Sequence, residues 1–502
     1  MRMRRHLLSL LLPMVSAASL LTACGTPVVN PVTGETEYSA MDESAEIDTG
    51  RKQHEQVIKE YGVYNNPKVQ AYVNEVGQKL ASQSHRPNLT WTFTVLDSTE
   101  INAFALPGGY VYITRGIMAY LDSEAELAGV LGHEIGHVCA RHGAQRATRQ
   151  QTAGLGVLAA TVLGAVLEAH GVSRATDMAS QVSQSAAAGY IASYSREQES
   201  QADGLGAEYL ARNHYNPQNM VNVIKVLKNQ ERFAADQAKA EGKPAPSGPN
   251  WLASHPSNDK RLADITDIAA TYSGQYGDDQ RPRYLQTVDG MSFGESREQG
   301  LTRGQGFYHE GLGIALTAPA GWRIQNTAEA ITLVNGAGDA GLIVRLVPEQ
   351  AGDTPEDVIR NVLKPSDGRY EQRSLNGLGA THFVGVVSNS QGQNKNVIVT
   401  VAKGPGKHLY LMQYAAKDAA ALQRNEALMR EAESSFRAMT AADRAAAKPW
   451  VIHTVSYPRG GFAEMARSTA LLDNKETRLK LLNGAYGDGP QPKPGQLVKT
   501  VQ

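Results

Sequence analysis

The stretch His133-Glu134-Ile135-Gly136-His137 predicts a helix that carries a zinc site. Two histidines four residues apart on a helix project from one face about one turn apart, so their imidazole nitrogens can bind one metal ion. Glu134 then lies beside the open coordination position. There it can take a proton from zinc-bound water, whose pKa falls to about 7, and later pass this proton to a leaving amine. The expected chemistry is hydrolysis of a peptide bond.

The residues before and around this stretch predict the helix without any metal. Ser123 and Glu126 have the spacing of a capping box at a helix N-terminus. Apolar residues then recur at helical spacing and predict one buried face: Leu127, Val130, Leu131, Ile135 and Val138. We therefore expect a rigid helix that presents both histidines.

A catalytic zinc site normally has three protein ligands, so a third ligand is needed. A motif that continues to a third histidine is excluded, because positions 140 and 143 would be glycine and histidine but are Ala140 and Gly143. The other common arrangement takes a glutamate from a second helix, with an aspartate one turn later that orients a zinc-binding histidine. Glu199 and Asp203 have this spacing.

The segment around Glu199 predicts that second helix. Ser195 and Gln198 again form a capping box, and an apolar face follows at Leu205, Tyr209 and Leu210. A lone Glu/Asp pair most often belongs to a solvated helix face. Together with the histidine stretch, the pair is better explained as a ligand and its partner.

Several further stretches accompany these residues: Asn102 to Gly109, Thr114 to Gly116, Glu124 to Ala128, Arg141-His142, Ser195 to Asp203 and Ser254 to Pro256. Together they resemble a zinc metallopeptidase family that includes the CAAX prenyl proteases, HtpX and BepA, over roughly residues 45–270. The resemblance implies a mainly helical zincin-type domain with a small β-sheet and one zinc per chain. It also implies site roles: His133, His137 and Glu199 as zinc ligands, Glu134 as general base and acid, and Asp203 behind a ligand.

The resemblance implies further site residues. Asn102-Ala103-Phe104 would line the cleft as an edge strand that pairs with an extended peptide, the alternative being an ordinary core strand. His255 would cap the zinc as a lid; alternatively, it is simply held before a proline turn. Arg261 is a further candidate for a regulatory or lid role and could stabilise oxyanion charge near the metal. His142 lies off the metal face and is expected to be structural.

The N-terminus predicts the location of the protein. A basic start and an apolar stretch too short to span a membrane predict a lipoprotein signal peptide at residues 1–23. Cleavage would leave Cys24 as a lipid-bearing residue at the head of a tether, residues 24–45. Gly25 favours the inner leaflet of the outer membrane in a Gram-negative bacterium. The alternative is a plain signal peptide with an accidental cysteine.

Composition adds limits on structure and partners. The net charge of −1, with both signs interspersed, gives no electrostatic case for nucleic acid. Cys139 is the only cysteine besides Cys24, so no disulfide is expected, and we expect it to be a buried apolar residue.

A chain of 502 residues predicts more than one domain. The metallopeptidase domain is expected at residues 46–276. Within it, Thr152 to Leu167 predicts a buried helix, with a membrane-leaning hairpin as the alternative, and Lys239 to Asn250 predicts a mobile loop leading to His255.

Residues 277–308 predict a linker, and residues 309–440 an α+β domain suited to binding or scaffolding. Residues 448–502 have an expected order of strand, helix, helix and strand that resembles the LysM peptidoglycan-binding module. Arg459-Gly460-Gly461 stands where that module usually has a Gly-Asp-Thr turn, so a structural cap is an equal alternative. The overall fold class is α+β, without tetratricopeptide repeats.

The favoured function is a periplasmic, lipid-anchored zinc endopeptidase that cleaves misfolded or misassembled envelope proteins. Its expected partners are polypeptide substrates and the membrane, with peptidoglycan as a further candidate through the tail. A peptidoglycan-directed or peptidoglycan-binding protein is the main alternative. A chaperone-like protein with a silent metal site is a third, but the complete set of His133, Glu134, His137 and Glu199 argues against it.

Overall fold

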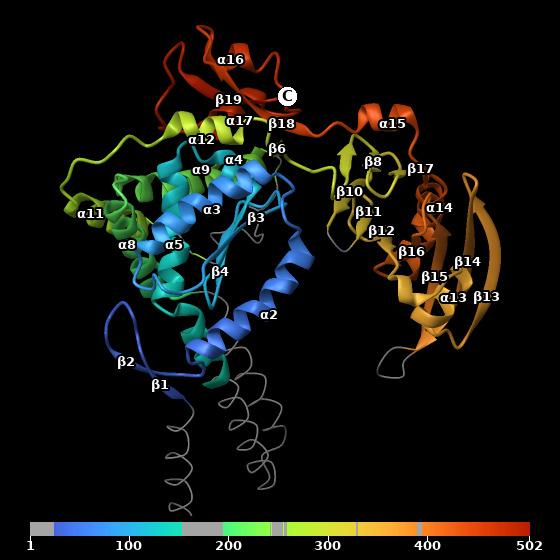
Figure 1. Cartoon of the computed structure of the whole chain (residues 1–502). Helices are drawn as coiled ribbons and strands as arrows, with labels where there is room; N and C mark the ends of the chain where they lie inside the picture. The colour runs from blue at the N-terminus through green and yellow to red at the C-terminus, as the bar shows by residue number, and fades with distance from the viewer. Residues whose placement is uncertain are drawn as a thin grey trace, which may run out of the picture. The chain divides into compact units, whose positions relative to one another are not determined.

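The computed structural model describes residues 25–152, 194–240, 242, 255, 259–327, 330–388 and 394–502. The signal peptide, Cys24, most of the segment 152–167 and nearly all of the loop 239–250 lie outside the described residues. The chain divides into two compact units (Figure 1). One comprises the residues up to Met291 together with Val451–Gln502, and the other comprises Ser292–Trp450.

The first unit is mainly helical and contains a small sheet, as expected. Its elements before residue 292 are β1 Thr26–Val29, β2 Thr36–Ser39, α2 Glu43–Tyr61, α3 Pro67–Ser82, β3 Thr92–Leu96, β4 Ala103–Leu106, β5 Tyr110–Thr114, α4 Arg115–Tyr120, α5 Glu124–Cys139, α8 Arg196–Arg212, α9 Gln218–Ala240, α11 Asp259–Thr271 and α12 Arg281–Val288. The central strand β5 pairs in parallel with β3 and antiparallel with β4. Strand β4 is therefore an edge strand within the described part of the chain.

Helix α5 is buried on all sides rather than on the single face that its periodicity predicts. It contacts α3, α8, α9, β4 and β5, which together surround it. The Ser123 side chain caps the helix by accepting from the Glu126 N–H, as expected. The Glu126 carboxylate does not complete a capping box, because it accepts from the N–H of Asp122 instead.

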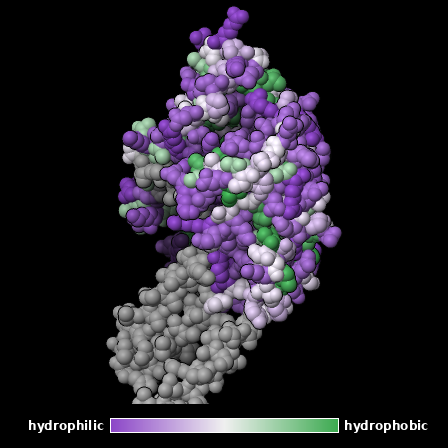
Figure 2. All heavy atoms as spheres, turned by 90° about the vertical axis from the view of Figure 1, so that its left-hand side faces the viewer, coloured by the Kyte–Doolittle hydropathy of each residue, from purple (hydrophilic) through white to green (hydrophobic). Residues whose placement is uncertain are grey.

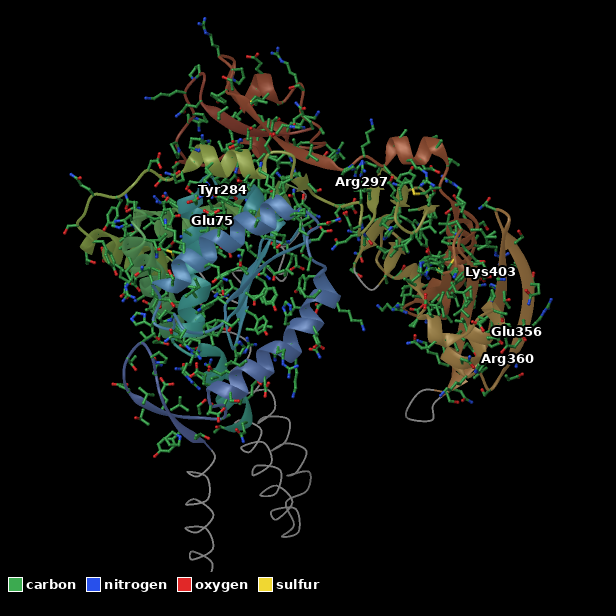
Figure 3. All side chains as sticks on the ribbon, viewed as in Figure 1. Glu75, Tyr284, Arg297, Glu356, Arg360 and Lys403 are labelled. Carbon is green, nitrogen blue, oxygen red and sulfur yellow. The ribbon has the colours of Figure 1, made fainter. Side chains whose placement is uncertain are left out.

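Residues 277–308 are not simply a linker. Tyr284, Leu285 and Val288 recur at helical spacing among polar residues, and α12 buries all three. Tyr284 is labelled in Figure 3. Its hydroxyl donates to the carbonyl oxygen of Met118 at 2.6 Å. The remainder of this segment holds strands of the second unit. A helix of eight residues within a polar stretch leaves only a weak pattern in the sequence, so α12 was not expected in the segment 277–308.

The C-terminal tail has the expected order of elements: β18 Trp450–Ser456, α16 Gly461–Met465, α17 Lys475–Leu482 and β19 Leu497–Val501. Strands β18 and β19 pair antiparallel. From Val451 onward the tail belongs to the first compact unit rather than standing alone. The Lys499 ammonium is fully buried and donates to the carbonyl oxygens of Ala119 and Leu121, at 2.8 and 2.5 Å.

The tail also packs against helix α9. The Tyr486 hydroxyl donates to Asp236 at 2.5 Å, and the rings of Tyr486 and Phe233 meet edge to face. Lys499 and Tyr486 therefore both hold the tail to the rest of the same unit, and the choice between a structural cap and a sugar-binding module stays a prediction.

The second unit is an α+β domain. Its elements are β6 Ser292–Phe293, β7 Leu301–Arg303, β8 Gly306–His309, β9 Ile314–Thr317, β10 Arg323–Asn326, β11 Ile331–Val334, β12 Ala340–Leu346, η2 Glu349–Ala351, α13 Pro355–Val358, η3 Ile359–Leu363, β13 Asp367–Leu375, β14 Leu378–Ser388, β15 Asn394–Lys403, β16 Leu409–Ala416, α14 Ala419–Ser434, β17 Arg437–Ala438 and α15 Ala441–Ala446. Seven antiparallel strands form its main sheet, in the order β10-β11-β12-β16-β15-β14-β13.

Alternating side chains of this sheet form two cores. On β16, Tyr410 and Met412 face a core that α14 covers, while Leu409 and Leu411 face a second core with α13. Strands β10 and β11 have only four residues each, and β13 is mostly exposed, so none of the three gives a strong strand signal in the sequence.

None of the helices in the described residues is both long and apolar enough to cross a membrane. The face drawn in Figure 2 is mostly hydrophilic, with its hydrophobic residues in small groups.

Candidate metal centre

The site forms where helices α5 and α8 pack closely together. A Cβ atom at Gly136 would lie 3.1 Å from the carbonyl oxygen of Ala202. A Cβ atom at Gly206 would lie 3.2 Å from the backbone nitrogen of His133. Larger residues at these positions would push the helices apart. The glycines thus allow Glu199 on α8 to reach the histidines on α5. Helix α8 begins with a complete capping box of Ser195 and Gln198, as predicted.

Four buried side chains bring their donor atoms together. The Nε2 atoms of His133 and His137 are 3.0 Å apart. The Glu199 carboxylate lies 3.7 Å from His133 Nε2 and 3.4 Å from His137 Nε2. The Nδ1 atom of His255 lies 3.2 Å from His133 Nε2 and 2.9 Å from Glu199 Oε1. All of these donor atoms lie within 4.8 Å of one another.

This donor set fits a tetrahedral metal ion. Bonds of 2.0–2.2 Å in a tetrahedron imply distances of about 3.3 Å between the ligand atoms. The observed distances lie around this value. Burial lowers the pKa of His137 to about 3, so its imidazole is neutral and can act as a ligand. Burial opposes ionisation of Glu199, but His255 and His137 hold its pKa well below the usual range.

A second set of contacts orients the ligands. The Nδ1 atom of His133 lies 2.9 Å from Asp203, as the spacing predicted. Arg261 donates to both oxygens of Asp203, at 2.6 and 2.8 Å, and pairs with Glu199 at 2.9 Å. Burial alone would raise the pKa of Asp203, but Arg261 and His133 hold it below its usual value. Arg261 also donates to the carbonyl oxygen of His255.

The guanidinium of Arg261 is engaged by Asp203, Glu199 and the backbone of His255. These contacts hold the three residues together, and the expected stabilisation of oxyanion charge stays a prediction. The position of Arg261 was not predictable from its spacing, since it depends on how α11 packs against α8.

His142 contacts the metal cluster in a way that helical spacing did not predict. Its Nδ1 atom lies 2.9 Å from Nδ1 of His137, and its Nε2 atom lies 2.9 Å from Gln201. The helix ends at Cys139, and Arg141 turns the chain at a φ of 60°. This turn brings His142 back beneath His137. Cys139 itself is fully buried and lies outside the donor set, as expected.

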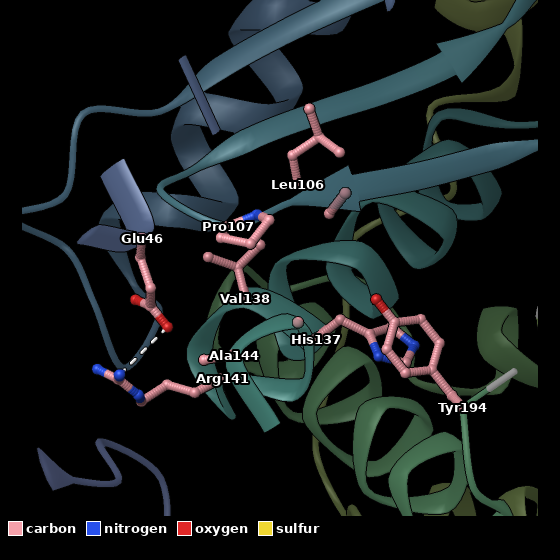
Figure 4. Close-up of a pocket in the computed structure, with 10 residues that line it drawn as sticks. Glu46, Leu106, Pro107, His137, Val138, Arg141, Ala144 and Tyr194 are labelled. Atoms are coloured by element: carbon pink, nitrogen blue, oxygen red, sulfur yellow. Dashed lines mark ion pairs between the residues drawn. The ribbon is translucent and has the colours of Figure 1, made fainter. Parts of the chain in front are cut away.

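Glu134 and strand β4 lie beside the cluster. Glu134 is fully buried, and its Oε1 atom is 3.7 Å from His255 Nε2. The end of β4 at Leu106 and the following Pro107 line a hollow next to His137 and Tyr194 (Figure 4). Asn102 stands just before β4, and the side chain of Ala103 is buried while the strand edge is unpaired among the described residues.

Comparison with known proteins agrees with the geometry. Residues 67–269 match Peptidase family M48. The beta-barrel assembly-enhancing protease of Yersinia pestis is 29% identical over 256 residues, covering 47% of this chain and 49% of that protein. The protein of the same name from Escherichia coli K12 is 27% identical over 275 residues, with 54% and 52% covered.

A eukaryotic protein is also similar to this chain. The mitochondrial metalloendopeptidase OMA1 of Schizosaccharomyces pombe is 28% identical over 240 residues, covering 47% of this chain and 64% of that protein. The chain spans about half the length of the bacterial relatives it matches. The match of residues 67–269 to Peptidase family M48 agrees with the resemblance that the sequence motifs indicate.

Proposed function

We propose that this protein is a zinc-dependent endopeptidase of the bacterial cell envelope that cleaves misfolded or misassembled polypeptides. The observation that carries the proposal is the buried cluster of His133, His137 and Glu199, with Glu134 on the helix that carries the two histidines. This is a complete set of ligands and base for metal-assisted hydrolysis.

Each residue of the cluster has a separate task. A bound zinc ion would polarise the substrate carbonyl and lower the pKa of an attacking water. Glu134 takes the proton of this water and delivers it to the leaving amine. Asp203 and His142 accept or share the Nδ1 protons of His133 and His137, so that each Nε2 lone pair faces the cluster. Arg261 keeps Asp203 ionised and holds both Asp203 and Glu199 in place.

Strand β4 supports a polypeptide substrate. Its outer edge offers backbone N–H and C=O groups with which an extended chain can pair. A short peptidoglycan cross-link peptide would use few of these groups. The tail also packs on the first unit through Lys499 and Tyr486, so the peptidoglycan-directed alternative gains no support from it.

The cell envelope is supported by the N-terminal sequence and by the relatives. The bacterial relatives are named as proteases that enhance β-barrel assembly. A lipid anchor at Cys24 would hold the enzyme in the periplasm, at the inner leaflet of the outer membrane. His255, whose Nδ1 atom lies beside His133 and Glu199, would occupy the fourth ligand position. The enzyme would stay inactive until the His255 side chain moves away from the cluster.

The test compares the full-length protein with Glu134→Gln on unfolded casein and on cross-linked muropeptides. We expect casein cleavage that falls by about 10³-fold in the variant, because the general base is lost. Bound zinc, measured by elemental analysis, should stay at one per chain in both proteins. Glu231→Gln, at an exposed position of α9, is the matched control.

Two results would reject the proposal. Casein cleavage that persists in Glu134→Gln would show that the site is not the catalyst. Cleavage of muropeptides without cleavage of casein would favour the peptidoglycan-directed alternative.

A further inference from the structure

Tyr194 is fixed directly beside the metal ligands. It precedes Ser195, the capping residue of α8, and its ring stacks on the ring of His137 with centroids 4.1 Å apart and planes 27° apart. The His255 ring lies 5.5 Å from it. The ring therefore has a defined place in the centre, set by the same helix that supplies Glu199.

The hydroxyl group of Tyr194 points into the hollow beside the cluster. Figure 4 shows the ring over His137, with its oxygen directed away from α8 and toward the strand that carries Leu106. Among the described residues this oxygen has no hydrogen-bond partner. Tyr72 in the same unit has none either, whereas several other tyrosines with buried rings there do have one: Tyr112 with His54, Tyr209 with His85, Tyr215 with Glu124 and Tyr284 with Met118.

The hollow offers no other uncommitted donor among the described residues that line it. Its polar side chains are Glu46, His137, Arg141 and Tyr194. Arg141 pairs with Glu46 at 3.4 Å and donates to the carbonyl oxygen of Met41. His137 is a ligand candidate. Arg261, on the other side of the cluster, is held by two carboxylates.

Peptide hydrolysis is faster when a hydrogen-bond donor lies beside the scissile carbonyl oxygen. Attack of water on the scissile carbonyl moves negative charge onto its oxygen, and a placed donor stabilises that charge more than it stabilises the substrate. A substrate paired with the β4 edge would run past His137 and the hollow. Its carbonyl would then come within reach of a group that lies between β4 and the cluster.

We propose that Tyr194 is a further catalytic residue, whose hydroxyl donates a hydrogen bond to the scissile carbonyl oxygen as that oxygen becomes negative. The tyrosine keeps its proton throughout, and Glu134 carries the proton that moves from water to the leaving amine. This inference rests on the proposed peptidase function. The Tyr194 hydroxyl acts on the substrate, whereas the Tyr194 ring stacks on His137 and supports it.

The test is Tyr194→Phe in the full-length protein, because this change removes only the hydroxyl. We expect kcat on a casein-derived peptide to fall by about 10²-fold, with KM and bound zinc unchanged. Affinity for a phosphinic peptide, which mimics the tetrahedral intermediate, should fall by the same factor in calorimetry. Affinity for the uncleaved peptide, measured in a Glu134→Gln background, should not change.

Tyr215→Phe is the matched control, since it removes a buried hydroxyl that is bonded to Glu124 and far from the hollow. It should leave kcat and phosphinic peptide affinity unaltered. Equal kcat and inhibitor affinity in Tyr194→Phe and wild type would overturn the proposal, as would loss of zinc in Tyr194→Phe. If wild type fails to cleave any peptide, the proposed function itself fails, while inhibitor binding still tests Tyr194.

Discussion

Two clusters of buried charge lie in the first unit, and they are built differently. The metal centre joins Glu199, Asp203 and Arg261 to imidazole nitrogens. The tail seam, which we define as Lys499, Glu126, Asp122 and Arg281, joins charges and backbone groups only. Burial lowers the pKa of Lys499 and raises that of Glu126.

The difference shows how a buried charge can be used. In the seam, the Lys499 ammonium donates to two carbonyl oxygens, and the Glu126 carboxylate accepts a backbone N–H. These bonds attach the tail. In the metal centre, the nitrogen lone pairs of the histidines converge on one point, so the charges around them serve a ligand. Changes in the metal centre should therefore alter metal binding and activity, and changes in the seam should alter stability.

The largest expected effect among these tests is on metal affinity. His142→Asn removes the contact to His137 Nδ1 and should weaken zinc binding by about 10- to 100-fold in competition with a chelator. The melting temperature of the metal-free protein should change little. His214→Asn, at an exposed position, is the control. Unaltered zinc affinity in His142→Asn would assign the orientation of His137 to another group.

The next prediction concerns His255, the fourth side chain of the metal centre, and tests whether the metal stays bound without it. His255→Ala should raise casein cleavage by about tenfold, because the fourth corner is then open to water and substrate. Zinc content should stay at one per chain, since His133, His137 and Glu199 remain. Loss of zinc together with loss of cleavage would show instead that His255 is a permanent ligand.

The smallest effect is expected in the seam. Lys499→Met leaves the carbonyl oxygens of Ala119 and Leu121 without their donor and should lower the free energy of unfolding by about 1 kcal/mol. Thermal or urea unfolding measures this, and kcat and zinc content should match wild type. Lys480→Met breaks only a surface pair with Glu476 and should change stability less. A tail that contributed nothing to the unit would make both variants equivalent.

Local spacing made the core of the metal centre predictable. The pairs His133 with His137 and Glu199 with Asp203 are each four residues apart on a helix, so their shared face follows from helix geometry. The α+β fold class was also predictable, and the edge position of β4 was implied by the family resemblance rather than by helix geometry. The roles of α12 and of the tail were not predictable, because the sequence of a short helix or strand does not show what it will pack against.

What the sequence determined by itself is which candidate residues share a helix face: His133 with His137, and Glu199 with Asp203. Only the tertiary structure decided which distant groups serve them. The left-handed turn at Arg141 brings His142 to His137, close packing at Gly136 and Gly206 brings the two helices together, and the start of α8 sets Tyr194 over His137. Such contacts depend on chain direction after a helix ends and on helix crossing, and neither is a local property of the residues involved.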